Sequence, residues 1–442
     1  MSNNLRGLMI VLALSLSLPP GAWSTPDTGT KVTTNADAPS SAPKHMGVAS
    51  CASSSCHGRA AASDRHDISL NEYRTWSRYD HHSRAFKTLQ SRHSQRIASN
   101  MGLADASKAP ACLACHAQVI PAEQMGERFH LSDGIGCESC HGGAERWLDN
   151  HYGANASHQT NLDNGLWPTE QSRFVAELCQ RCHLGDTEQL ANHEMMAAGH
   201  PRLRFELDTW MALMPAHHVV DADYQQRKSP DSATQRWITG RYSAALGYLE
   251  LLVQHANGKN LIPELVIYDC HSCHRPMDES VLRSPVDRQL LPAGALRLND
   301  NTLRILAEII AVRDRSAGKA LKAQIRRLHR ASTRSAAELR RVANAIKQQL
   351  EATGKITTDF ALTDTERHQL QRALLREASA GHFRDYADAE QLFLALQLLA
   401  GSPSRDTPPY PGLFSLLDNE NRFRPRAFAQ EARRLLSLED AQ

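Results

Sequence analysis

The chain has 442 residues, and its 50 Lys and Arg against 48 Asp and Glu give a formal net charge of +2. This balance excludes the strongly basic surface expected of a nucleic-acid-binding protein, so we expect no nucleic-acid partner. The apolar share of 41% is enough for a packed interior, yet aromatic residues make up only 6%. The unusual counts are 10 Cys and 22 His.

Residues 1–24 have the pattern of a secretory signal peptide. Arg6 precedes an apolar run over residues 8–18, and "PPGAWS" follows with small residues at Ala22 and Ser24. The run is short for a transmembrane helix, and an uncleaved anchor is the alternative. No other segment approaches 18 consecutive apolar residues. We therefore expect export to the periplasm and no membrane span after cleavage.

Composition divides the rest of the chain into three predicted domains behind a linker. Residues 25–46 are mainly Thr, Ser, Ala and Pro, which predicts a flexible linker. All ten cysteines and 18 of the 22 histidines lie between Gly47 and Met277. We expect a Cys- and His-rich domain over 47–285, a helical bundle over 286–402, and a C-terminal tail with a short helix over 403–442.

The ten cysteines form five pairs, and each pair is closed by a histidine. Four are strict Cys-x-x-Cys-His motifs, whereas the first has four residues between its cysteines. A given Cys is followed by His about one time in twenty by chance, so five such pairs arise with a probability on the order of 10⁻⁶ or less. In chain order the motifs are Cys51/Cys56/His57, Cys112/Cys115/His116, Cys137/Cys140/His141, Cys179/Cys182/His183 and Cys270/Cys273/His274.

This pattern is typical of covalent haem c attachment. Two thiols add across the vinyl groups of one haem, and the next residue, a histidine, becomes the proximal iron ligand. Zinc ribbons do not need His directly after the second Cys, and a thioredoxin-type redox motif would occur once. In the first motif we expect the two extra residues to bulge outward; a structural disulfide is the alternative there. The sequence predicts five covalently attached haems c, whose porphyrins would fill the core in place of aromatic residues.

The sixth coordination position of each iron separates electron transfer from catalysis. A second histidine gives low-spin iron without room for a substrate, whereas an empty position gives a potential enzyme. The candidate distal ligands are His82, His151, His193, His200 and His218, with His130, His158, His217, His81 and His271 as second choices and Met195 or Met196 as a substitute. Arginines near the motifs are candidate partners of the haem propionates: Arg84, Arg128, Arg181, Arg202, Arg204 and Arg275. We expect His329, His368 and His382, outside the haem region, on the surface.

The helices predicted from periodicity and capping lie mostly in the second half of the chain. Within the Cys-rich part, one amphipathic helix follows Ser232. Further on, Asn301 is a candidate N-cap, Ser335/Glu338 and Thr363/Glu366 are capping boxes, and Asp385 precedes a fourth apolar run. These four helices with short connections predict a bundle. The basic run over 319–330 is expected to be a solvated helix face.

Three stretches resemble the multihaem c-type cytochromes grouped with cytochrome c-554 and hydroxylamine oxidoreductase. They are "DGIGCESCHGGAERWLDNH", "LCQRCH" followed by "MMAAGHPRLRFELDTW", and "YDCHSCH". Over residues 47–280 the resemblance implies closely stacked, mostly bis-His haems in the periplasm, with His82 and His200 as distal ligands of haems remote in sequence. The chain lacks the Cys-x-x-Cys-Lys motif of pentahaem nitrite reductases, and it has five motifs where hydroxylamine oxidoreductases have eight.

We therefore predict a mainly α-helical fold with little regular sheet, in which packed haems form the core ahead of the helical bundle. The predicted function is electron transfer between redox partners such as cytochromes, a quinol dehydrogenase or a terminal reductase, without catalysis. Propionates and ferric iron would bring the charge to about −3, which favours basic partners. One alternative is a reductase of a small nitrogen or sulfur compound with one open haem. The other is a subunit of a polymeric cytochrome filament, and a homo-oligomer remains open.

Overall fold

The computed structural model describes residues 42–62, 69–256, 264–274, 291–292, 295–354, 361–401 and 409–440. Residues 43–442 form one compact unit, separate from residues 1–42. The predicted signal peptide, most of the predicted linker, and Arg275 lie outside the described residues.

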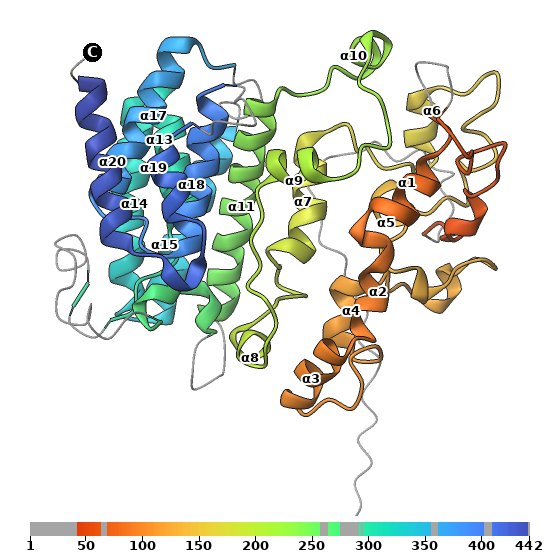
Figure 1. Cartoon of the computed structure of the whole chain (residues 1–442), viewed down its shortest axis with the longest axis horizontal. Helices are drawn as coiled ribbons and strands as arrows, with labels where there is room; N and C mark the ends of the chain where they lie inside the picture. Colours follow the sequence, from red (N-terminus) through yellow and green to blue (C-terminus); the bar gives the residue numbers. More distant parts are fainter. Residues whose placement is uncertain are drawn as a thin grey trace, which may run out of the picture. The chain divides into compact units, whose positions relative to one another are not determined.

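The fold is mainly helical, which confirms the predicted fold class (Figure 1). Among the described residues, β pairing is limited to two isolated bridges, His45 with Met125 and Tyr268 with Leu298. The first half of the chain forms short helices: α1 (Glu72–Tyr79), α2 (Ala85–Leu89), α3 (Arg92–Asn100), α4 (Pro110–His116), α5 (Glu138–His141), α6 (His158–Asp163), α7 (Ser172–His183), α8 (His193–Ala197), α9 (Leu207–Leu213) and α10 (Ala222–Lys228).

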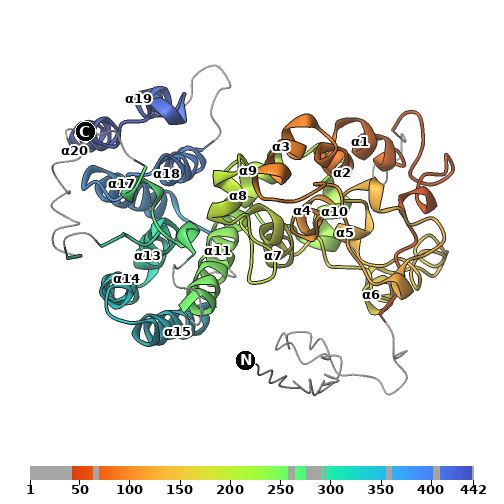
Figure 2. The ribbon, with the colours of Figure 1, turned by 90° about the horizontal axis from the view of Figure 1, so that it is seen from below.

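Longer helices make up the second half. They are α11 (Ala233–Ala256), α13 (Asn301–Arg313), α14 (Arg315–Ser332), α15 (Ala336–Ala352), α17 (Asp364–Ser379), α18 (Tyr386–Leu399), α19 (Pro411–Leu416) and α20 (Pro425–Asp440). Helix α11 packs on α7 and α9 of the first half and on α13, α15 and α18 of the second (Figure 2). It therefore joins the Cys-rich region to the helical bundle.

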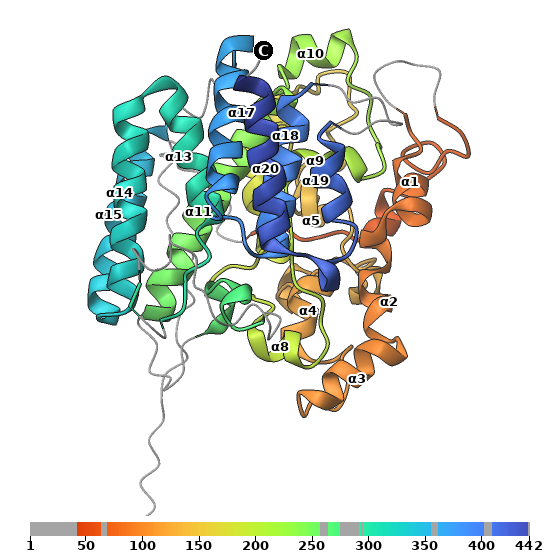
Figure 3. The same ribbon diagram turned by 60° about the vertical axis from the view of Figure 1, so that its left-hand side comes forward.

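The bundle consists of two helix groups that share α13 (Figure 3). In the first group, Leu303, Leu306 and Ile310 of α13 pack in a core with residues of α11, α14 and α15. Ile305 and Ile309 lie in the core of the second group, with α17, α18, α19 and α20. Apolar residues on both faces of α13 explain why it is buried along most of its length.

The helix starts follow the predicted capping chemistry only in part. Thr363 with Glu366 forms a complete capping box, whereas at Ser335 only the hydroxyl takes part, accepting a hydrogen bond from the Glu338 backbone. Asn301, expected as an N-cap, is instead the first residue of α13, behind Asp300. The Asp300 side chain makes no capping hydrogen bond because buried cationic groups bind its carboxylate.

Those cationic groups form a charged cluster inside the bundle. Asp300 pairs with Arg297 at 2.8 Å, with Arg304 at 2.6 Å and with Nε2 of His329 at 2.8 Å. Burial opposes ionisation of Asp300, but the Arg297 and Arg304 guanidinium groups and the hydrogen bond from His329 hold its pKa well below the usual range. The expected surface position is therefore wrong for His329, which is fully buried, whereas His368 is exposed as expected.

The third histidine of the bundle also departs from the expected surface position. His382 is only partly exposed, and its Nε2 lies 3.6 Å from the Glu377 carboxylate. Burial together with the nearby Arg304 guanidinium lowers the pKa of His382 to about 3. The ring is therefore packed as a neutral group beside the charged cluster.

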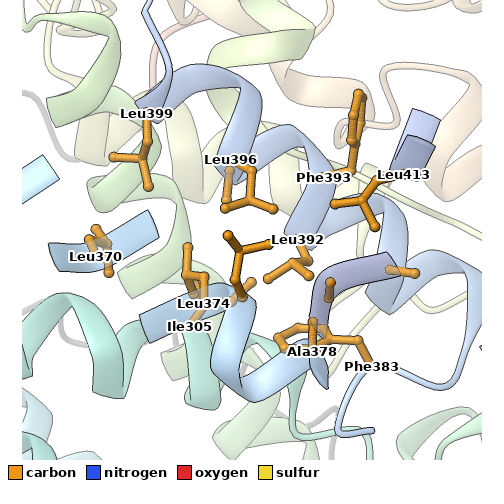
Figure 4. Close-up of a cluster of buried hydrophobic side chains, with 14 of the residues drawn as sticks. Ile305, Leu370, Leu374, Ala378, Phe383, Leu392, Phe393, Leu396, Leu399 and Leu413 are labelled. Atoms are coloured by element: carbon orange, nitrogen blue, oxygen red, sulfur yellow. The ribbon is translucent and has the colours of Figure 1, made fainter. Parts of the chain in front are cut away.

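The C-terminal residues are part of the second core. Where the sequence predicted a tail with a short helix, the described residues form α19 and α20, and α20 packs on α17. Leu413, Phe423 and Phe428 are buried with Leu374 and Leu392 in this core. Figure 4 shows Leu413 of α19 beside Phe393 of α18. The last helices thus close the bundle.

Shortening Leu413 tests whether these last helices carry stability. Leu413 is 0% exposed, so Leu413→Ala is expected to lower the free energy of unfolding by about 2–5 kcal/mol. Leu438 of α20 is 50% exposed, and Leu438→Ala should change the free energy of unfolding by less than about 0.5 kcal/mol. Urea unfolding followed by far-UV circular dichroism measures both. Equal losses in the two variants would contradict the buried position of Leu413.

Candidate haem-binding sites

Each Cys-x-x-Cys-His motif is held in a helical turn that brings its histidine back to its first cysteine. Helices α4, α5 and α7 end at His116, His141 and His183. In the third motif the His141 backbone N–H donates to the carbonyl of Cys137 at 2.9 Å. The fifth motif repeats this bond from His274 to Cys270 at 2.7 Å. Thiols and imidazole are thereby fixed on one short segment.

The first motif makes the corresponding hydrogen bond in spite of its longer loop. The His57 N–H donates to the Cys51 carbonyl at 3.2 Å, and residues 53–55 of the longer loop are exposed. A Cβ on Gly58 would lie 1.9 Å from the Ala52 carbonyl oxygen, so only glycine fits where the chain leaves this loop. The two extra residues therefore form an outward bulge. None of the ten cysteines is paired in a disulfide, Cys51 and Cys56 included.

The second cysteine of two motifs is exposed, Cys140 in the third and Cys273 in the fifth. The fifth motif forms a single short turn, η6 (Cys270–Ser272), and Cys273 follows that turn as its C-cap. Haem attachment at this accessible thiol stays a prediction.

The five motif histidines each face one other histidine, and no partner is shared between motifs. An iron bound by two imidazole nitrogens at about 2.0 Å holds the two ring centroids about 6.3 Å apart. The five observed separations therefore fit a bis-His iron. The pairs are His57 with His151 (6.1 Å), His183 with His82 (6.0 Å), His116 with His200 (6.4 Å), His141 with His217 (6.4 Å) and His274 with His193 (6.2 Å).

Hydrogen bonds at Nδ1 orient five of these ten rings. A metal-binding histidine commonly donates its second ring N–H to a carboxylate or a backbone carbonyl, which leaves the other nitrogen for the metal. The acceptors are Glu72 for His57 (2.9 Å), Asp80 for His82 (2.9 Å), and the carbonyls of Ala85 for His116 (3.1 Å), Leu148 for His151 (2.5 Å) and Pro201 for His200 (2.8 Å). In each ring Nε2 is the nitrogen that remains for iron.

Burial keeps further rings neutral. Removal from water, reinforced by neighbouring imidazoles, lowers the pKa of His141 to about 4, and burial with His82 nearby does the same for His183. A neutral imidazole is the form that can offer a nitrogen lone pair to a metal. The electrostatics of both rings therefore suit a ligand role.

At the third motif the structure favours His217 over His218, the residue preferred from the sequence. The His217 ring faces His141, whereas His218 lies beside His217 at 5.6 Å and stacks on Tyr224 at 5.4 Å. Since the two histidines are adjacent, nothing in the local sequence separates them. We therefore revise this candidate to His217.

The other second choices stand outside the five pairs. His158 uses both ring nitrogens, Nε2 toward Glu170 at 2.9 Å and Nδ1 toward the Lys228 ammonium at 2.5 Å. It therefore has no nitrogen left for iron. The other second-choice candidates, His81, His130 and His271, do not belong to any of the five pairs.

Thiols of different motifs lie next to one another. Cys51 of the first motif and Cys137 of the third act on each other's ionisation, which lowers the pKa of Cys51 and raises that of Cys137. Cys115 of the second and Cys182 of the fourth likewise act on each other, which raises the pKa of Cys115 and lowers that of Cys182, and Cys182 also acts electrostatically on Cys140 of the third. Since a haem is attached at its cysteines, the groups bound at these motifs would be near neighbours.

The arginines expected to bind propionates have protein partners or face solvent. Arg202 pairs with Asp385 at 2.6 Å, Arg204 with Glu390 at 3.4 Å, and Arg181 with Asp186 at 3.2 Å. Arg84 and Arg128 are exposed. Propionate binding by these arginines stays a prediction.

Fold and site together define a c-type cytochrome, and comparison with known proteins supports this class. Residues 50–142, which carry the first three motifs, match the family model of cytochrome c554 and c-prime. This match covers about a fifth of the chain and supports a c-type cytochrome similar to the c554 family, with covalently bound haem c and a role in electron transfer. No curated protein sequence and no solved structure matches the chain.

None of the described helices combines the length and the apolar character that crossing a bilayer requires.

A buried carboxylate secures the segment that leads into the first motif. Glu138, inside the third motif and 3% exposed, accepts backbone hydrogen bonds from Met46 (2.7 Å), Gly47 (2.7 Å) and Ala144 (2.8 Å). One side chain thereby ties the third motif to the segment before Cys51. Nothing in the sequence indicated this role, because an acidic residue between two cysteines has the appearance of a surface position.

Replacing Glu138 tests this connection. Glu138→Ala leaves three N–H groups without their charged acceptor and should lower the free energy of unfolding by about 3 kcal/mol. The control is Glu145→Ala: exposed Glu145 accepts one hydrogen bond, from the Lys44 N–H at 3.0 Å, and its loss should cost less than about 1 kcal/mol. Urea unfolding measures both, and limited proteolysis should cut Glu138→Ala faster near residues 44–47. Comparable losses in the two variants would contradict the anchoring role.

Proposed function

We propose that the protein is a pentahaem cytochrome c that transfers electrons through five bis-His haems. When bound, haem c supplies a one-electron Fe(III)/Fe(II) couple. The observation that carries the proposal is that each of the five motif histidines has a histidine partner 6.0–6.4 Å away. The ten cysteines would provide the thioether attachments and the ten paired imidazoles both axial positions.

The cysteine contacts suggest an order for the five sites. The first motif adjoins the third through Cys51 and Cys137, and the second adjoins the fourth through Cys115 and Cys182. Cys140 and Cys182 link the third motif to the fourth. His193, the partner of the fifth motif, begins α8, and His200, the partner of the second, follows three residues after the end of this helix. We therefore propose a path from the first motif through the third, fourth and second to the fifth.

Filled axial positions argue against the reductase alternative. A haem-based reductase needs one iron with an open position for its substrate. Here each motif histidine, including His57 of the first motif with its longer loop, faces a second imidazole. The distal residues would therefore exclude small molecules from iron, as an electron carrier requires.

The filament alternative receives no support from the distal residues. A filament that shares ligands between subunits would leave a motif histidine without a partner inside its own chain. All five partners belong to the same chain. A homo-oligomer with complete sites in each subunit is compatible with this arrangement.

We also propose a periplasmic location and protein redox partners. The apolar run over residues 8–18 supports export, and members of the cytochrome c554 family are typically periplasmic. The partners would be cytochromes, a quinol dehydrogenase or a terminal reductase. The helical bundle would serve as the scaffold that supports the haem region over residues 47–285.

Carbon monoxide tests the proposal, since it binds ferrous haem only where an axial position is open. The reduced wild-type protein, shown by mass to carry five haems, should keep its visible spectrum under carbon monoxide. His217→Ala should bind carbon monoxide at one haem per chain, because it opens the third site. A wild-type protein that binds one equivalent would contradict the proposal and favour the reductase.

His218→Ala is the matched control for this variant. His218 adjoins His217 and lies against Tyr224, so its removal should leave all five haems unreactive toward carbon monoxide. Binding in His218→Ala but not in His217→Ala would show that the sequence-based choice of His218 was right.

A further inference from the structure

A cavity of about 580 Å³ lies where the haem region meets the helical bundle. Its lining comes from α7, α11, α18, the segment over 202–205 and residues 266–267. Aromatic and aliphatic side chains form much of the wall, and at Gly247 of α11 an added Cβ would meet no atom within 4 Å. The cavity therefore has an apolar wall that an extended flat group could contact.

The fully buried cation in this wall is Arg241 of α11. Its residue is 3% exposed, and its guanidinium donates to two neutral acceptors, the Phe205 carbonyl at 3.3 Å and the Gln391 side-chain oxygen. Among the residues that the structure describes, no carboxylate lies within ion-pair distance of it. A buried guanidinium without an anion is strongly unfavourable, so this site calls for a negative charge.

The neighbouring carboxylates are already engaged. Glu206 acts on Arg241 only through longer-range electrostatics, and its two oxygens accept the Asp208 and Thr209 N–H groups at the start of α9. The other three arginines of the wall have partners of their own: Arg181 pairs with Asp186, Arg202 with Asp385 and Arg204 with Glu390. Arg241 is thus the cavity cation that remains for an incoming anion.

We propose that Arg241 binds a carboxylate that enters this cavity, namely a propionate of the haem bound at the fifth motif. The chain connects the cavity to that motif twice. Ile267, in its wall, lies three residues before Cys270, and Arg202, also in its wall, binds the Asp385 carboxylate that accepts the Cys270 N–H at 3.2 Å. This assignment rests on the proposed function, because it requires haem at the fifth motif.

The same chemistry has a second source, a soluble carboxylate from the medium. A guanidinium offers two parallel N–H donors to either, so the Arg241 geometry alone does not separate them. They differ in one respect: a propionate is part of the holoprotein, whereas a soluble carboxylate must be added.

The experiment compares Arg241→Gln with Arg241→Lys in the holoprotein, after mass and visible spectra have established five haems per chain. A spectroelectrochemical titration then resolves the five reduction potentials. Loss of a buried cation beside a propionate stabilises ferric iron. One of the five reduction potentials should therefore fall in Arg241→Gln by about 59 mV. This shift is a tenfold change in the equilibrium constant of a one-electron couple. Arg241→Lys keeps the charge and should restore most of the wild-type value.

Arg236→Gln is the matched control, because Arg236 lies on the same helix but already pairs with Asp208 at 2.7 Å. It should leave all five potentials unchanged. Five haems whose potentials do not move in Arg241→Gln would overturn the inference and leave the proposed function intact, whereas a protein with fewer haems would count against the proposed function itself. A shift that appears in the wild type only on adding succinate would assign the site to a soluble carboxylate and overturn the propionate.

Should Arg241→Gln fail to fold, the wild type still decides between the sources. Addition of succinate to the wild-type holoprotein should not raise its melting temperature or move any potential, because the propionate already occupies the guanidinium. Stabilisation by succinate would overturn the assignment.

Discussion

The structure depends on one constraint, the separation of about 6 Å at which ten imidazoles are held in five pairs. A single imidazole can be placed by the motif to which it belongs, but its partner comes from elsewhere in the chain. His82 and His183, for instance, approach each other from η2 (His81–Arg84) and the end of α7. The path of the chain through the haem region is therefore largely the path that brings each distal histidine to its motif.

The same constraint explains why the two halves of the protein are built so differently. The bundle has two extensive apolar cores, whereas the haem region contains only small clusters, such as Leu89 with Ala98 and Ala106. Short helices and loops with so little buried apolar surface need another source of cohesion. Covalently attached porphyrins provide that surface, so the cofactors would complete the core as well as carry the electrons.

The bundle is joined to the haem region by buried charges close to the fifth motif. Asp385, the N-cap of α18, accepts a hydrogen bond from the Cys270 N–H and pairs with Arg202. Arg384 pairs with Asp269 at 2.9 Å, directly before that motif. Such pairs are costly to break once buried, so they fix the start of the fifth motif against a rigid support, while Cys273 at its far side faces solvent. A helical scaffold thereby determines where one end of the proposed path lies.

Much of the site could be predicted from the sequence, because covalent attachment demands a fixed local spacing. Distal residues have no such signature. His82, His151, His193 and His200 were chosen from their surroundings, and His217 could not be separated from His218 because only the fold aims one of the two rings at His141. In the bundle, capping residues such as Thr363 marked helix starts, but α20 was missed as part of the core, since the Pro-rich stretch before it has the composition of a tail. Asp300, His329 and Arg241 were missed for the opposite reason: charged residues are usually exposed.

The most direct test of the central claim is a quantitative electron paramagnetic resonance spectrum of the fully oxidised protein, with low-spin and high-spin haems counted per chain. Five bis-His sites predict five low-spin haems and no high-spin signal. A high-spin haem would mean that one motif histidine lacks its partner when the cofactor is bound, and it would contradict the account of this protein as a purely electron-transferring cytochrome.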